Sequence, residues 1–185
     1  MSTTTTKPNF QNLYEKTIAP ALKEKFAYKN VMQTPKLSKI VINMGLGEAK
    51  DDPKIIEEAR EQLAMMTGQM PKITRTRKAV SNFKIRKDLA IGCAVTLRKK
   101  MMYEFLERFV CVACPRIRDF RGFSPRQFDG AGNYNVGLTD QTIFPDINLD
   151  KVKRSLGMNI TVVTTATTDA EAMELLKGFG FPFRK

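Results

Sequence analysis

Three segments of the chain alternate between apolar and polar side chains, a pattern typical of β-strands with one buried and one solvated face. These segments are 37–44, 91–98 and 158–166, and shorter runs at 83–86 and 133–138 also favour strands. Strands of parallel sheets are usually apolar throughout, because both of their faces are buried. The alternation therefore favours an antiparallel sheet with one covered face.

Segments with the apolar spacing of amphipathic helices separate these strands. We expect helices over 10–26, 53–67, 101–113 and 170–178. Pro20 is expected to kink or divide the first helix, while Asp52 and Asp169 are expected to cap the second and the last. Because strands and helices are interspersed, we predict a two-layer α+β fold, with helices on one face of an antiparallel sheet and the other face open.

The length of 185 residues suits one hydrophobic core. We expect a disordered tail at 1–9, which contains a run of four Thr, followed by a single domain from 10 to 185. No apolar run reaches the roughly 18 residues that a membrane-spanning helix needs. The N-terminal residues also lack a secretion signal, so we expect the protein to act in the cytoplasm.

Positive charge is concentrated in the middle of the chain. The net charge is +12, and residues 72–126 hold 15 of the 31 Lys and Arg against four acids. Such a balance favours a polyanionic partner, with nucleic acid as the first candidate and an anionic membrane surface as the second. A membrane-binding protein would need a basic amphipathic helix, whereas these cations lie mainly in predicted loops and strands.

The chemistry available to the chain argues against catalysis. There is no His, which removes the commonest general base and the commonest zinc ligand, and we expect neither a metal nor a cofactor. Cys111 and Cys114 form a C-x-x-C pair, for which we favour buried structural thiols. A thiol oxidoreductase that uses this pair is kept as an alternative function.

Two further features are candidates for RNA contact. Residues 72–82 contain four cations and no acid, so we expect an exposed, mobile loop that binds a polyanion. The open sheet face is expected to display Lys39, Asn43, Lys84, Arg86, Thr96, Arg98, Asn159, Thr161 and Thr165. Such side chains can pair with phosphates, ribose hydroxyls and base edges.

Arginine and aromatic residues also interleave between residues 116 and 128. The arginines are Arg116, Arg118, Arg121 and Arg126, and the apolar residues among them are Ile117, Phe120, Phe123 and Phe128. This pattern is typical of an RNA contact, but it equally fits a core of Phe with a solvated arginine rim. The residues alone leave both readings open, but the excess of 15 cations over four acids in residues 72–126 favours the RNA contact.

Several motifs, in order along residues 14–185, resemble the bacterial large-subunit ribosomal protein five family. They are Asn43-Met-Gly-Leu-Gly, Thr67-Gly-Gln, Thr74-Arg-Thr-Arg-Lys-Ala, Phe83-Lys-Ile-Arg, Ile91-Gly-Cys-Ala-Val-Thr-Leu-Arg, Pro115-Arg-Ile-Arg-Asp-Phe-Arg-Gly, Phe128-Asp-Gly-Ala-Gly-Asn-Tyr, Ile143-Phe-Pro, Gly157-Met-Asn-Ile-Thr and Gly180-Phe-Pro-Phe-Arg-Lys. One departure is Lys72, which stands where an apolar residue is expected.

The resemblance implies a non-catalytic structural protein of the cytoplasmic ribosome that binds 5S ribosomal RNA and helps attach it in the central protuberance. Asn43, Gln69 and Thr96 match positions associated with 5S contact. We add Lys39, Arg86 and Arg98 as predicted phosphate contacts. The resemblance further implies contact with large-subunit ribosomal RNA, with neighbouring proteins of the protuberance and with a small-subunit bridge protein. It assigns contact with P-site tRNA to the basic loop, where we name Lys72, Thr74, Arg75, Thr76, Arg77, Lys78, Ser81 and Asn82.

Overall fold

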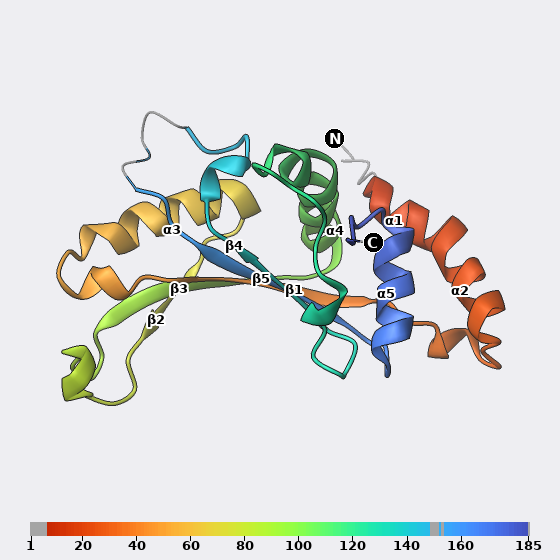
Figure 1. The fold of residues 1–185 in the computed structure, drawn as a ribbon, viewed down its shortest axis with the longest axis horizontal. Coiled ribbons are helices and arrows are strands. Elements are labelled where there is room, and N and C mark those ends of the chain that lie inside the picture. The colour runs from red at the N-terminus through yellow and green to blue at the C-terminus, as the bar shows by residue number, and fades with distance from the viewer. Residues whose placement is uncertain (1–6, 149–151, 153, 185) are drawn as a thin grey trace, which may run out of the picture. The chain divides into compact units, whose positions relative to one another are not determined.

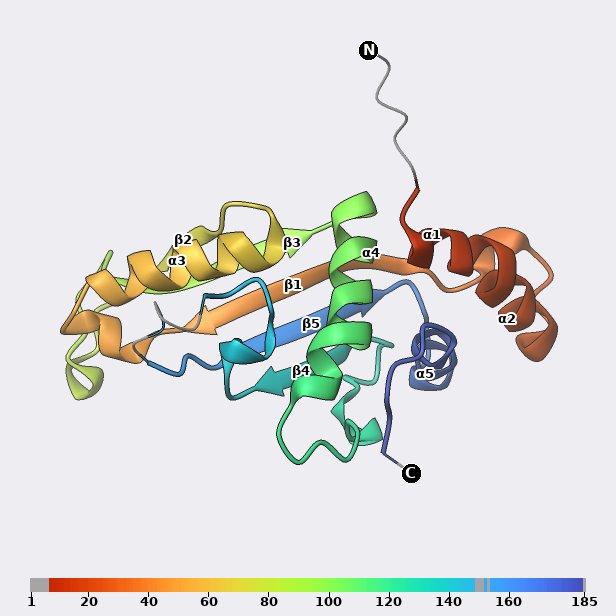
Figure 2. The ribbon, with the colours of Figure 1, turned by 90° about the horizontal axis from the view of Figure 1, so that it is seen from above.

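A five-stranded open sheet organises the chain, with the strand order β2-β3-β1-β5-β4. The strands are β1 (Leu37–Gly45), β2 (Lys72–Arg75), β3 (Ala90–Leu97), β4 (Tyr134–Leu138) and β5 (Met158–Thr164). The structure is a computed structural model, which describes residues 7–148, 152 and 154–184. Neighbouring strands run antiparallel (Figures 1 and 2), and helices accompany the sheet. The predicted two-layer α+β fold is therefore confirmed.

Contacts between residues divide the chain into two compact units. The helical unit comprises residues 1–40, 98–136 and 161–185, and the hairpin unit comprises residues 41–97 and 137–160. Most of the predicted tail at 1–9 lies outside the described residues, which begin at Lys7. The prediction of a single domain from 10 to 185 stays a prediction, because the division does not show whether the units fold separately.

In the hairpin unit, helix α3 (Lys54–Thr67) packs along β3 (Figure 2). The Asp52 carboxylate accepts a hydrogen bond from the Lys54 amide at 3.1 Å, but the helix starts one residue later than predicted, with Pro53 and not Asp52 at the N-cap position. The helix ends at Gly68, whose φ of 70° is the left-handed conformation that glycine adopts without strain. Its predicted apolar stripe, which consists of Ile55, Ile56, Ala59, Leu63 and Met66, is buried.

The helical unit begins with the predicted helix at 10–26, which forms as α1 (Asn9–Leu13), a π-helical turn (Tyr14–Ile18) and α2 (Ala19–Phe26). Pro20 lacks an N–H and its ring crowds the carbonyl one turn earlier. A widened turn directly before a proline accommodates that clash without ending the helix. Pro20 therefore distorts the helix, as predicted, but does not divide it.

Two further helices complete the helical unit. Helix α4 (Lys99–Arg108) continues into a π-helical turn (Phe109–Ala113), so the predicted helix at 101–113 starts two residues earlier. Helix α5 (Asp169–Gly178) confirms the last predicted helix, but Asp169 does not cap it. Thr168 and Glu171 form a reciprocal capping box there, and the Asp169 carboxylate instead accepts from the Gly132 amide at 3.0 Å.

Two predictions around the basic loop were wrong. Residues 72–75 form strand β2 instead of a loop, because the backbone pairs with β3 and places Ile73 opposite Cys93. Residues 83–86 are not a strand. Phe83 ends a 3₁₀ turn and Lys84 follows with a φ of 53°, which extended backbone does not allow. The segment that leaves the sheet therefore runs from Thr76 to Leu89.

Gly92, in β3, is expected to be intolerant of a side chain. A Cβ at this position would lie 2.5 Å from the Met44 carbonyl oxygen and 2.9 Å from Thr74 Oγ1, and the first of these atoms is backbone. Gly92→Ala should therefore lower the free energy of unfolding by about 1–3 kcal/mol. Gly137→Ala is the matched control, because its new Cβ meets only Asn159 Oδ1 at 3.6 Å. Equal denaturant stability of the two variants would contradict this packing.

Candidate nucleic-acid interface

The sheet of the hairpin unit has one face covered by α3 and one open face. On the covered face, Cys93 approaches the Ile56 carbonyl, with 3.8 Å between Sγ and oxygen. The residues on either side of Asn43 and of Thr96 are buried, and they are Ile42, Met44, Val95 and Leu97. Since side chains alternate along a strand, Asn43 and Thr96 project from the opposite face. Asn43 is exposed and Thr96 is half-buried.

Strand β2 extends this open face. Its register pairs Lys72 with Ala94 and Thr74 with Gly92. Cross-strand partners project from the same face of a sheet, and Ala94 alternates with the buried Cys93 and Val95. Lys72 and Thr74 therefore stand on the same face as Thr96, although both were predicted in a loop. We call Asn43, Lys72, Thr74 and Thr96 the open-face set.

Beyond β2 and β3, residues 76–89 form a closed hairpin loop held by Thr76. The Thr76 hydroxyl donates to the Arg86 carbonyl and accepts from the Leu89 amide at 3.0 Å. The Thr76 backbone amide donates to the Leu89 carbonyl at 2.9 Å, and its carbonyl accepts from the Asp88 amide at 3.1 Å. Thr76 is only 6% exposed. Its side chain thus shapes the loop from inside.

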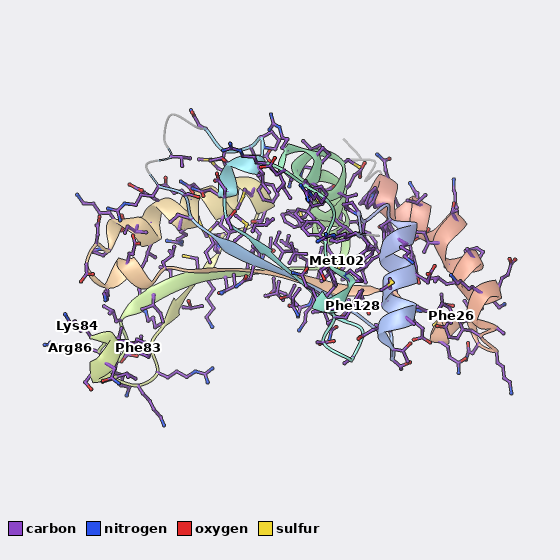
Figure 3. All side chains as sticks on the ribbon, viewed as in Figure 1. Phe26, Phe83, Lys84, Arg86, Met102 and Phe128 are labelled. Carbon is purple, nitrogen blue, oxygen red and sulfur yellow. The ribbon has the colours of Figure 1, made fainter. Side chains whose placement is uncertain are left out.

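The loop and the strand end before it carry six exposed cations, which are Arg75, Arg77, Lys78, Lys84, Arg86 and Lys87. Asp88 is the one acid between residues 75 and 89, and its backbone carbonyl accepts from the Arg75 guanidinium at 3.0 Å. Lys84 and Arg86 lie at the end of the hairpin together with Phe83 (Figure 3). Both were expected on the open sheet face. The structure places them in the loop instead.

The remaining predicted contacts lie in different places. Gln69 is exposed in the turn after α3, where the Thr67 hydroxyl donates to its carbonyl at 3.0 Å. Ser81 and Asn82 are exposed in the 3₁₀ turn of the loop. Lys39, which is half-buried, and Arg98, which is exposed, belong to the helical unit.

The helical unit also shows how its arginine and aromatic residues divide. Phe123 is buried, and its ring centroid lies 6.0 Å from that of Phe109 and 5.2 Å from that of Phe181. Phe128 lies 4.6 Å from Tyr134. The arginines of this segment are exposed, and they are Arg116, Arg118, Arg121 and Arg126. The aromatic rings therefore form part of the core, which leaves the arginines as a rim.

Two family models match the chain. One is described as Ribosomal protein L5 and matches residues 30–86, and the other is described as the C-terminus of the same ribosomal family and matches residues 90–183. The chain belongs to the ribosomal protein L5 family.

Curated relatives agree along nearly the whole length. The chain is 57% identical over 179 residues to "Large ribosomal subunit protein uL5" of Chlorobium phaeobacteroides (strain BS1), which covers 97% of this chain and 91% of the relative. It is 57% identical over 173 residues to the protein of the same name from Clostridium kluyveri (strain NBRC 12016), which covers 94% of this chain and 96% of the relative. As an L5-family member, the chain is an RNA-binding structural component of the large subunit of the cytoplasmic ribosome and acts in translation.

Family membership makes the chain a non-enzymatic component, which removes the thiol oxidoreductase alternative. The prediction of two buried thiols is confirmed for Cys114 and wrong for Cys111, which is exposed. Cys114 is buried, and burial raises its pKa to about 12, helped by the neighbouring Cys111. Burial also raises the pKa of Cys93. A redox pair needs a thiol with a lowered pKa, because the thiolate is the nucleophile.

Alkylation of the folded chain with iodoacetamide at neutral pH is expected to modify Cys111, which is exposed, and to spare Cys93 and Cys114. Cys114 remains a neutral thiol until the pH approaches about 12, so its reaction should stay slow below that value. Mass spectrometry should count one adduct on the folded chain and three in urea. Rapid modification of Cys114 in the folded chain would contradict the assignment of a buried, inert thiol.

Two other possibilities find no support in the described residues. No group of three or more Cys, Asp or Glu side chains is placed there to hold a metal ion. No helix in that part of the chain is both long enough and apolar enough to cross a membrane.

Proposed function

We propose that the protein binds 5S ribosomal RNA through the open face of the hairpin unit. The observation that carries the proposal is the shared location of Asn43 and Thr96. Family resemblance associates both residues with 5S contact, and both project from the sheet face that α3 leaves uncovered. The Asn43 amide can donate and accept hydrogen bonds, and the Thr96 hydroxyl can do both. Such groups can pair with ribose hydroxyls and base edges. Cations that bind only phosphates do not distinguish one RNA sequence from another.

Cations beside this face supply the attraction to phosphates. Lys72 belongs to the open-face set, and Arg86 is exposed in the adjoining loop. We assign Arg86 to phosphate contact with 5S RNA, together with the predicted contacts Lys39 and Arg98, and we reassign Lys72 to the same role from its predicted contact with tRNA. Gln69 keeps its predicted role as an uncharged contact to 5S RNA. Phosphate neutralisation releases counterions, so the affinity should fall steeply with salt.

The hairpin loop is proposed to contact P-site tRNA. Its exposed cations lie on a loop that hydrogen bonds of Thr76 close, so several positive charges are gathered on one short segment. Arg75, Arg77 and Lys78 are assigned to tRNA phosphates, with Ser81 and Asn82 as polar contacts. Thr76 is assigned to loop shape, since its hydroxyl is already bonded to the loop backbone.

The proposal extends to attachment of 5S RNA in the central protuberance, to contacts with large-subunit RNA and neighbouring proteins there, and to a bridge with a small-subunit protein. This part rests on family resemblance alone.

Equilibrium binding of the full chain to 5S RNA tests the proposal, with an RNA of the same length and a scrambled sequence as control. The expected result is tighter binding of 5S RNA at moderate salt, where non-specific electrostatic binding is weakened. Equal affinities for the two RNAs would contradict specific recognition by the open face.

A further inference from the structure

Phe83 has an unusual environment at the tip of the hairpin loop. Among the aromatic side chains of the described residues it alone is exposed, with 69% of its surface accessible. The helical unit, by contrast, buries or half-buries its Phe rings in stacked pairs such as Phe105 and Phe109, whose centroids are 6.2 Å apart. Burial of an aromatic side chain stabilises a folded protein. The exposed ring of Phe83 therefore does not contribute this stabilisation to the fold.

The backbone holds Phe83 in this exposed position. It ends the 3₁₀ turn Ser81–Phe83, and the Lys84 amide donates to the Ser81 carbonyl at 2.9 Å. Val80 and Ile85 close the turn with a reciprocal pair of backbone hydrogen bonds at 3.1 and 3.3 Å. These bonds leave the ring at the end of the hairpin, next to Lys84 and Arg86 (Figure 3).

The surroundings of the ring select the kind of partner. The loop around it carries five exposed cations, which are Arg77, Lys78, Lys84, Arg86 and Lys87. An apolar protein surface that covered Phe83 would have to desolvate cations without pairing them, at a large cost. An RNA segment can pair with the cations and also cover the ring, because its phosphates bind the cations and an unpaired base stacks on the ring.

We propose that Phe83 stacks on an unpaired base of the RNA that the hairpin loop binds. This inference rests on the proposed function, in which the loop cations bind RNA phosphates. It adds a contact between Phe83 and a base of the same RNA. Stacking on an aromatic ring tolerates any base, so Phe83 selects unpaired over paired nucleotides and not one sequence over another.

The absence of Trp from the chain permits a direct test. Phe83→Trp places the single Trp of the variant chain at the proposed contact, and a base that stacks on it should quench the Trp emission. The probes are a stem-loop RNA and the same RNA with abasic loop nucleotides, which keeps every phosphate but removes the bases. Met70→Trp is the matched control, since Met70 is 63% exposed in the same unit but lies outside the loop.

The expected result is strong quenching of the Phe83→Trp chain by the stem-loop RNA, weak quenching by the abasic RNA, and little effect of either on the control. Phe83→Leu, which keeps an apolar side chain but loses the ring, should bind the stem-loop RNA about 5- to 150-fold more weakly and the abasic RNA unchanged.

Other outcomes separate the two proposals. Salt-sensitive binding of both RNAs without quenching would overturn stacking and leave the electrostatic role of the loop intact. Equal quenching by both RNAs would also overturn it, because the contact would then be with the backbone. No binding of either RNA at low salt would overturn the RNA-binding role itself. If the Trp emission changes on addition of RNA-free ribosomal proteins but not on addition of RNA, the partner of Phe83 is a protein and not a base.

Discussion

Replacement of Arg75, Arg77 and Lys78 together by Ala is expected to speed dissociation of tRNA from the P site of ribosomes that carry the variant by on the order of tenfold to a hundredfold. Each lost phosphate contact should also lower the slope of log affinity against log salt by roughly one unit. The loop is closed by Thr76 and by the Val80–Ile85 pair, so the fold should survive the change. Specific affinity for isolated 5S RNA should remain nearly intact.

A matched control removes three positive charges from the helical unit instead of from the loop. Lys16, Lys23 and Lys29 are exposed in the helical unit, and their joint replacement by Ala should leave tRNA dissociation unchanged. A loop variant that loses 5S binding but retains tRNA normally would show that the two surfaces have been assigned the wrong way round.

Asn43→Ala is expected to weaken binding of 5S RNA by about 1–3 kcal/mol, because RNA groups that pair with the amide would be left without a partner. Asn43 is uncharged and releases no counterion, so the salt slope of binding should stay nearly constant. Its side chain is exposed and the neighbouring core residues Ile42 and Met44 are unchanged, so stability should hardly move.

Lys72→Ala is the informative comparison on the same face. It removes a charge from the open-face set, so it should lower the salt slope by about one unit, in contrast to Asn43→Ala. Equilibrium titrations of 5S RNA at several salt concentrations measure both effects. A lower slope for Asn43→Ala, with intact affinity at low salt, would refute its assignment as a hydrogen-bonding contact.

Alternation along single strands was enough to predict much of the fold. Ile40, Ile42 and Met44 are buried as expected, and the positions of Asn43 and Thr96 on the open face follow from the same period of two. These features depend on the local chain alone, because a strand with one apolar side can be stable in only one orientation. The helices at 10–26 and 101–113 were predictable for the same kind of reason.

Features that depend on distant partners escaped prediction. Strand β2 has one large apolar residue, Ile73, and forms because the edge of β3 offers backbone pairs to it. At Asp169, a nearby Thr168 competes for the cap, and the carboxylate is taken up by Gly132 from another part of the chain. The pairing of β2 and the Gly132 partner of Asp169 cannot be read from the local sequence, whereas the Thr168-x-x-Glu171 spacing is typical of a capping box and could have indicated the cap.

The loop shows the same limit at the candidate site. Alternation placed Lys84 and Arg86 on the sheet, whereas the positive φ of Lys84 and the Val80–Ile85 pair turn the chain away from it. Thr76 resembled its exposed neighbours in sequence, yet its hydroxyl bonds to backbone groups ten and thirteen residues away. Exposure of Phe83 likewise follows from the turn that presents it.

The RNA that co-purifies with the tagged chain provides the most direct test of the central claim that the protein recognises 5S RNA. Sequencing should be done on a nuclease-free lysate from which ribosomal subunits have been removed by centrifugation. We predict that 5S RNA predominates with the wild-type chain and is depleted with Asn43→Ala. A predominance of messenger RNA or of DNA would contradict the account.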